Sequence, residues 1–98
     1  MLWFKRYVRG RDVVVAIADE ELMGKCFEEG EFVLKVTSFF KGELLREEEV
    51  LERLKEATII NAVGERAVKV VIKAGLATEK GVKRVAGVPH LQVVLYFI

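Results

Sequence analysis

A continuous apolar run at residues 13–18, Val-Val-Val-Ala-Ile-Ala, is the strongest constraint on the fold of this chain. Four of its six residues are β-branched, which favours an extended strand over a helix. A strand with one face in water alternates between apolar and polar residues, and this segment does not alternate. We therefore predict a strand that is buried on both faces and lies centrally in a sheet.

The flanking segments alternate between strand-like and helix-like patterns. Two helices stand out, because their apolar residues recur at helical spacing and acidic residues occupy their first turns. The order indicates an α+β fold, a two-layer α/β sandwich whose mixed sheet has its helices packed on one face. The predicted strands are 2–8, 13–18, 32–37, 58–63, 82–86 and 91–98, and the predicted helices are 19–24 (or 19–30), 46–57 and 64–74. Segment 58–63 can also extend the helix before it, although its β-branched residues favour a strand.

The composition indicates one soluble, intracellular domain. Ninety-eight residues, of which 52% are hydrophobic and 32% charged, suffice for a single core, so residues 1–98 are expected to form one domain. The single cysteine, Cys26, excludes an intramolecular disulfide and suits a reducing cytoplasm. The longest uncharged stretch, residues 85–98, is shorter than the roughly 20 residues of a membrane helix. Uncharged polar residues are scarce, as in hyperthermophile proteins, and we expect a thermophilic source.

The charges are segregated along the chain. Residues 1–12 carry a net charge of +3, residues 13–52 carry −7 and residues 53–98 carry +5. Two interpretations are open. Either these are separate solvated faces, or the two positive blocks meet in space as a surface for anions or nucleic acid. The fold decides between them, because an acidic strand can lie between the two blocks.

Several short motifs occur in an order typical of one small archaeal family. They are residues 19–25, 39–43, 57–59, 63–65 and 87–90, together with Phe27, Glu29, Gly30, Asn61, Val68 and Gln92. On these residues the chain resembles a domain of unknown function, number 424 in its series, over nearly its whole length. The resemblance implies an archaeal, cytoplasmic, stand-alone α/β sandwich with a loose link to translation. It implies no activity, cofactor or catalytic residue. Phe40 and Leu91 stand where the family pattern has Tyr and Ala.

The segment from Gly87 to Gln92 is the strongest candidate for a site. His90 is the only histidine, and Pro89 before it stiffens the backbone. Gly87 permits a backbone conformation or a close approach that a side chain would block. Such an imidazole can act as an acid, a base or a ligand contact near neutral pH. The alternative is a buried histidine that is hydrogen-bonded to the backbone at the start of a strand and has only a structural role.

The junction at residues 61–65 is a second candidate, because it is predicted to pass from a strand into a helix. Asn61, Gly64 and Glu65 can line an anion site at the helix start, but Glu65 would repel phosphate. Asn61 can instead be a cap or an internal hydrogen-bonding group. We expect no cofactor, and one His and one Cys do not make a metal site without carboxylates.

The first hairpin supplies candidate phosphate contacts in Arg6, Arg9 and Arg11, although exposed arginines are common at hairpins. Three hypotheses follow. The favoured one is a non-catalytic binding module for RNA or a translation-associated protein. The second is a small enzyme or ligand sensor, in which Asn61, Glu65 and Gln92 surround His90 in one pocket. The third is a homo-oligomer that hides the apolar C-terminal strand. Trp3, Phe4, Phe39 and Phe40 can stack on bases, but they also suit an ordinary core.

Overall fold

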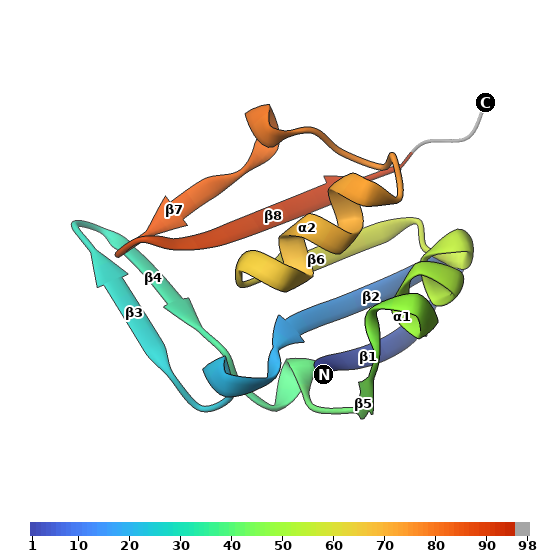
Figure 1. The fold of residues 1–98 in the computed structure, drawn as a ribbon, viewed down its shortest axis with the longest axis horizontal. Coiled ribbons are helices and arrows are strands. Elements are labelled where there is room, and N and C mark those ends of the chain that lie inside the picture. The colour runs from blue at the N-terminus through green and yellow to red at the C-terminus, as the bar shows by residue number, and fades with distance from the viewer. Residues whose placement is uncertain (96–98) are drawn as a thin grey trace.

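The computed structural model describes residues 1–95 and contains a six-stranded mixed sheet, two α-helices and a separate two-stranded hairpin (Figure 1). The strand order of the large sheet is β5-β1-β2-β6-β8-β7. The strands are β1 (Leu2–Arg9), β2 (Asp12–Asp19), β3 (Cys26–Glu29), β4 (Phe32–Lys35), β5 (Glu43–Leu45), β6 (Ile59–Val63), β7 (Lys83–Val85) and β8 (Val88–Val94), and the helices are α1 (Glu47–Arg53) and α2 (Glu65–Lys73). The predicted α+β fold, with its helices on one face of a mixed sheet, is confirmed.

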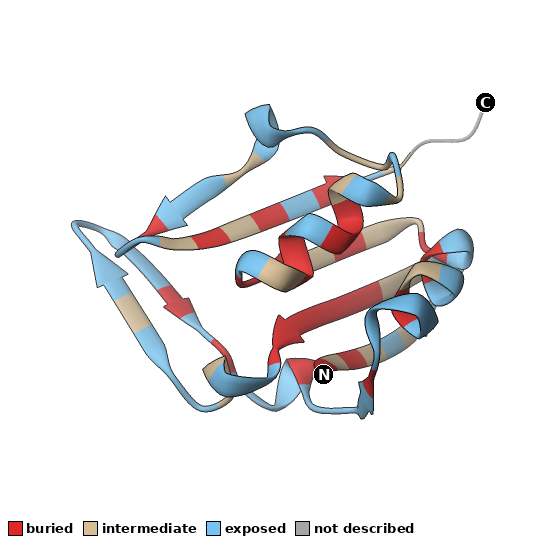
Figure 2. Ribbon diagram, in the orientation of Figure 1, coloured by how far each residue is buried: buried red, intermediate tan, exposed pale blue. Residues whose placement is uncertain are grey.

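The apolar run at residues 13–18 forms most of β2, an inner strand of the sheet. β2 pairs antiparallel with β1 and parallel with β6. Residues 15 to 18 have no exposed surface, as Figure 2 shows by the red stretch along β2. The prediction of a central strand buried on both faces is therefore confirmed. The segment at 58–63 is also a strand, because it is the parallel partner of β2.

The helices cover one face of this sheet and form the larger core with it. Alternate residues of the inner strands point towards the helices, among them Phe4, Ile17, Ile60 and Leu91. Val50 and Leu54 of the α1 region and Val71 of α2 pack against them. We call this side of the sheet the helix face. In Figure 1 both helices lie in front of the sheet.

The opposite side of the sheet, which we call the open face, is only partly covered. Hairpin β3–β4 and the turn after it pack Leu34, Val36 and Phe40 against Ala16 and Ala18. The rest of this face bears the side chains of β1, β6 and β8 that alternate with the helix-face residues. It includes Lys5, Tyr7, Asn61, His90 and Gln92, which range from half-buried to exposed.

The segment after β2 differs from the sequence prediction. Residues 19–24 were expected to form a helix with Asp19 as its cap, but the structure has a single 3-10 turn at Glu20–Leu22. Asp19 contributes no cap bond to that turn, because its carboxylate is used by α2 instead. Of the predicted strand 32–37, Phe32–Lys35 form β4, but this strand pairs with β3, outside the main sheet. Strands β3 and β5 were not predicted, since they have only four and three residues, and two of the four residues in β3 are Glu.

The C-terminal strand begins earlier than expected. β8 starts at Val88 rather than Leu91, so that Pro89 and His90 lie within the strand. Of the predicted strand 91–98, residues 96–98 lie outside the described part of the chain. Within residues 1–95, no helix has the length and apolarity needed to span a bilayer.

Candidate functional site

His90 and Asn61 face each other on neighbouring strands of the open face. In the antiparallel pairing of β6 with β8, Val63 lies opposite His90 and Asn61 lies opposite Gln92. This register brings the imidazole Nε2 within 2.9 Å of the carboxamide Oδ1 of Asn61. A carboxamide oxygen only accepts, so Nε2 carries the proton and Nδ1 remains an acceptor. The structure thus brings Asn61, His90 and Gln92 together on the open face. That they form a functional site stays a prediction.

The imidazole of His90 is held in its neutral form. Partial burial lowers its pKa below the ordinary value of 6.5, and the positive charge of Lys83 lowers it further. Lys83 lies directly opposite His90 in the pairing of β7 with β8. The ion pairs formed within residues 1–95 leave Lys83 without a carboxylate partner. A neutral ring beside an unpaired ammonium group is suited to contacting a polar or anionic ligand.

This titration predicts a loss of stability in mild acid. As the pH falls from 7.5 to 5.5, His90 becomes protonated near pH 6.5 in the unfolded chain but only at lower pH in the folded chain. Stability should therefore decrease over this range, by less than about 1.4 kcal/mol per pH unit. Urea unfolding of the wild type and of His90→Gln at both pH values measures it. The free energy of unfolding should fall less on acidification in the Gln variant than in the wild type. Equal falls in the two proteins would exclude His90 as the cause.

A pocket of about 490 Å³ lies beside this pair, between hairpin β3–β4 and the β7–β8 edge of the sheet. Its polar residues are Lys83, Arg84, His90 and Gln92, and its apolar wall includes Phe32 and Leu34. Phe32 remains 66% exposed, which is high for a phenylalanine. The pocket therefore combines an accessible aromatic ring with hydrogen-bonding groups and a cation.

A hydrogen bond connects hairpin β3–β4 with the turn between β7 and β8, the two elements that flank the pocket. The backbone N–H of Ala86, in the turn between β7 and β8, donates to a carboxylate oxygen of Glu29 at 2.7 Å. Ala86 and Gly87 both have positive φ, 50° and 83°, which is typical of a tight hairpin turn. Gly87 thus serves the turn. Pro89 is buried in β8, and its carbonyl accepts from the N–H of Gly64 at 2.9 Å.

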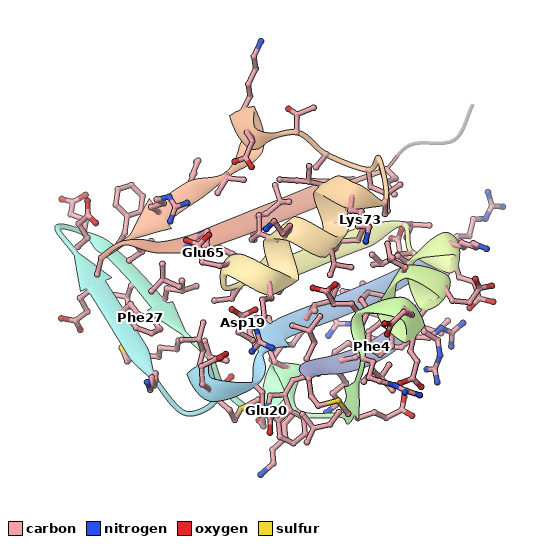
Figure 3. The ribbon with its side chains drawn as sticks, viewed as in Figure 1. Phe4, Asp19, Glu20, Phe27, Glu65 and Lys73 are labelled. Atoms are coloured by element: carbon pink, nitrogen blue, oxygen red, sulfur yellow. The ribbon has the colours of Figure 1, made fainter. Side chains whose placement is uncertain are left out.

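Glu65 does not belong to this pocket. It lies in the first turn of α2 on the helix face, where Figure 3 labels it, and its carboxylate accepts from Arg84 at 2.7 Å. The expectation that Glu65 would join Asn61 and Gln92 around His90 thus differs from the structure. The reason is that the chain crosses from the open face to the helix face between β6 and α2. Glu65 is also exposed, and the bond from Arg84 lowers the pKa of its carboxyl.

Gly64 takes part in a buried contact at the junction of β2, β6 and α2. The carboxylate of Asp19 accepts the backbone N–H groups of Ala67 at 2.8 Å and of Arg66 at 3.3 Å, and so caps α2. Burial raises the pKa of Asp19 above its ordinary value, while these two bonds oppose the rise. Gly64 has a φ of +109°, and any side chain there would collide with the Asp19 carboxylate. Figure 3 shows Asp19 at the end of β2, below the start of α2.

The three predicted phosphate contacts do not share one surface. Arg6 points to the helix face, and its guanidinium lies 3.6 Å from the carboxylate of Glu56. Arg9, by the alternation of β1, belongs to the open face, and Arg11 lies in the turn before β2. This turn lies at the β1–β2 end of the sheet, away from His90, because His90 pairs with the last residue of β6. Phosphate binding by Arg9 and Arg11 stays a prediction.

Phe32 and Lys83 were not recognised from the sequence as site residues. Each lies in a segment whose strand character was predicted, but alternation alone does not say which strands become neighbours. The stacking candidates Trp3 and Phe40 pack in the smaller core, and Phe4 is buried in the larger core. The ring of Phe39 stacks on that of Tyr7, with centroids 5.0 Å apart. Within residues 1–95, no three His, Cys, Asp or Glu side chains gather where they could hold a metal ion.

Comparison with known proteins identifies the family. Residues 7–96 match the family described as "Protein of unknown function (DUF424)". The chain belongs to this family. The resemblance seen in the sequence motifs is thereby confirmed. No curated protein matches the sequence of this DUF424 chain.

A solved structure has the same fold as this DUF424 chain. It is the crystal structure of an uncharacterized conserved protein from Methanopyrus kandleri, with 28% sequence identity and a TM-score of 0.79. The match covers 99% of this chain and 95% of that one. The six-stranded sheet and its hairpin are therefore an architecture that the DUF424 chain has in common with this protein.

Proposed function

We propose that this protein is a non-catalytic binding module for single-stranded RNA, and that one unstacked base enters the pocket beside His90. The observation that carries the proposal is the exposed ring of Phe32, which shares a pocket with Gln92, His90 and Lys83. Proteins bind single-stranded nucleic acid by stacking bases on aromatic rings along a positively charged groove.

Each group in the pocket has a part in such a complex. The Phe32 ring supplies the stacking surface. The carboxamide of Gln92 offers both a donor and an acceptor, and the free Nδ1 of His90 offers an acceptor, so that a base edge can form hydrogen bonds. The ammonium group of Lys83 can contact a phosphate. The combination of a ring for stacking, partners for a base edge and a cation for a phosphate fits RNA, and RNA is therefore the ligand that we propose.

Two observations favour binding over catalysis. Of the described residues that line the pocket, none is a Ser, Thr or Cys that could act as a nucleophile. Glu65, the carboxylate expected to assist His90, is bound to Arg84 on the helix face. His90 is left with Asn61, a neutral partner that orients the ring and supplies no charge. This arrangement suits a ligand contact better than an acid or base.

Salt dependence provides the first test. A fluorescein-labelled octauridylate should bind the protein, and the logarithm of its association constant should fall linearly with the logarithm of salt concentration. A slope of about −0.7 is expected for each phosphate contact, hence about −0.7 to −2 for one to three contacts. Fluorescence anisotropy at KCl concentrations from about 50 to about 300 mM measures this slope. Absence of binding at the lowest salt would refute the proposed function.

A further inference from the structure

The open face of the sheet extends beyond the pocket as a strip that crosses four strands. The register places Lys5, Ala16, Asn61 and Gln92 side by side on β1, β2, β6 and β8. The next row of the same face consists of Tyr7, Val14, Ile59 and Val94, and Val94 is 53% exposed. Ala16 is fully buried under the hairpin and the turn after it, so the first row is interrupted at β2. The surface that continues from Gln92 across the sheet is therefore the apolar row, with Asn61 and Lys5 along its edge.

The charges on this strip are mainly positive. Among residues 1–95, the alternation of β1, β2, β6, β7 and β8 assigns Lys5, Arg9 and Lys83 to the open face, against one acid, Asp12. The two positive blocks of the sequence thus both contribute to this face. The strands between them, β2 and β6, place no acid there apart from Asp12, whose carboxylate accepts from the Thr58 hydroxyl. Over the strands of the large sheet the strip is complementary in charge to a phosphate backbone, whereas hairpin β3–β4 at its pocket end carries Glu28, Glu29 and Glu31.

Lys5 marks the far end of the strip. Its ammonium group lies 5.2 Å from the centre of the Tyr7 ring, a cation–π contact that holds it over the sheet. Three strand spacings of about 4.8 Å separate its row position from that of Gln92, a span of about 14 Å. Stacked nucleotides advance about 3.4 Å each, so the span corresponds to about four nucleotides.

We propose, resting on the RNA binding proposed above, that the RNA strand runs across the sheet from the pocket at β8 to Lys5 on β1. One base enters the pocket, the following bases lie on the apolar row of Val94, Ile59 and Val14, and a phosphate reaches Lys5. The strip alone, without the pocket, would not select RNA, because the stacking ring lies at the pocket end.

Chain length and one lysine test this path. Labelled oligouridylates of about one, two, four and eight nucleotides should bind with affinity that rises up to about four and then changes little. Lys5→Gln keeps most of the aliphatic stem that lies on Tyr7 and removes only the charge. This variant should weaken tetrauridylate binding several-fold and lower the salt slope by about 0.7, while mononucleotide binding is unchanged. Lys69→Gln is the matched control, because Lys69 is exposed on α2, on the opposite side of the sheet.

The outcomes separate the two proposals. Length-dependent affinity that Lys5→Gln removes and Lys69→Gln leaves intact supports the path. If uridine monophosphate binds as tightly as the tetramer, or if both lysine variants behave alike, the path is refuted while RNA binding in the pocket stands. If no oligonucleotide of any length binds, the proposed function fails as well. Circular dichroism of each variant confirms that the fold is retained.

Discussion

Replacing Gly64 by alanine should destabilise the domain by more than about 3 kcal/mol, a large part of the roughly 5–15 kcal/mol that holds such a domain together. Two costs add at this position. The backbone φ of +109° lies in a region open essentially to glycine, which costs other residues about 1–3 kcal/mol. The new Cβ would also lie 2.6 Å from both carboxylate oxygens of Asp19 and displace the cap of α2. Losing such a cap costs about 1 kcal/mol.

Gly24→Ala is the matched control for this prediction. Gly24 also has a positive φ, +85°, but no atom lies within 4 Å of the position that its Cβ would occupy. Its substitution should therefore cost only the backbone strain, about 1–2 kcal/mol. Urea unfolding followed by circular dichroism measures both variants. Equal losses would show that the Asp19 contact is unimportant. In an Asp19→Ala background, Gly64→Ala should cost less than it does alone, because the collision has been removed.

The second large effect concerns binding. Phe32→Ala should weaken the affinity for octauridylate about 5- to 150-fold, equivalent to about 1–3 kcal/mol for one lost stacking contact. Stability should change little, because Phe32 is 66% exposed. Fluorescence anisotropy at one fixed salt concentration gives the affinity. Val8→Ala serves as the control, since Val8 is likewise exposed but lies near the β1–β2 turn. An unchanged affinity for Phe32→Ala would show that no base stacks on this ring.

Local patterns in the sequence were enough to predict most strands and both α-helices. The apolar run of β2 indicates its central position, because no other environment accommodates six consecutive apolar residues in a strand. The apolar stripes of α1 and α2 similarly identify the side on which they pack. The α+β class follows from these elements. The short β3 and β5 were missed because segments of four and three residues carry little strand signal and their pairing comes from tertiary contacts.

The contacts that were not predicted join residues far apart in the sequence. Asp19 has the features of a cap for the residues that follow it, yet it caps α2, which begins 46 positions later. That contact exists because β2 and β6 are parallel and end at the same edge of the sheet. Asn61 and Glu65 are close in sequence but lie on opposite faces. Phe32 reaches His90 only through the packing of the hairpin, which no local pattern specifies.

The most direct test of the account is a nuclear magnetic resonance titration of the ¹⁵N-labelled protein with tetrauridylate. The account predicts that the side-chain amide of Gln92 and the backbone amides of Phe32, Lys83 and His90 shift, with smaller changes at Asn61 and Lys5. The amides of α1 and of the exposed side of α2 should stay unchanged, because they lie on the other side of the sheet. Shifts confined to the helices, or no shifts at saturating RNA, would contradict RNA binding in this pocket.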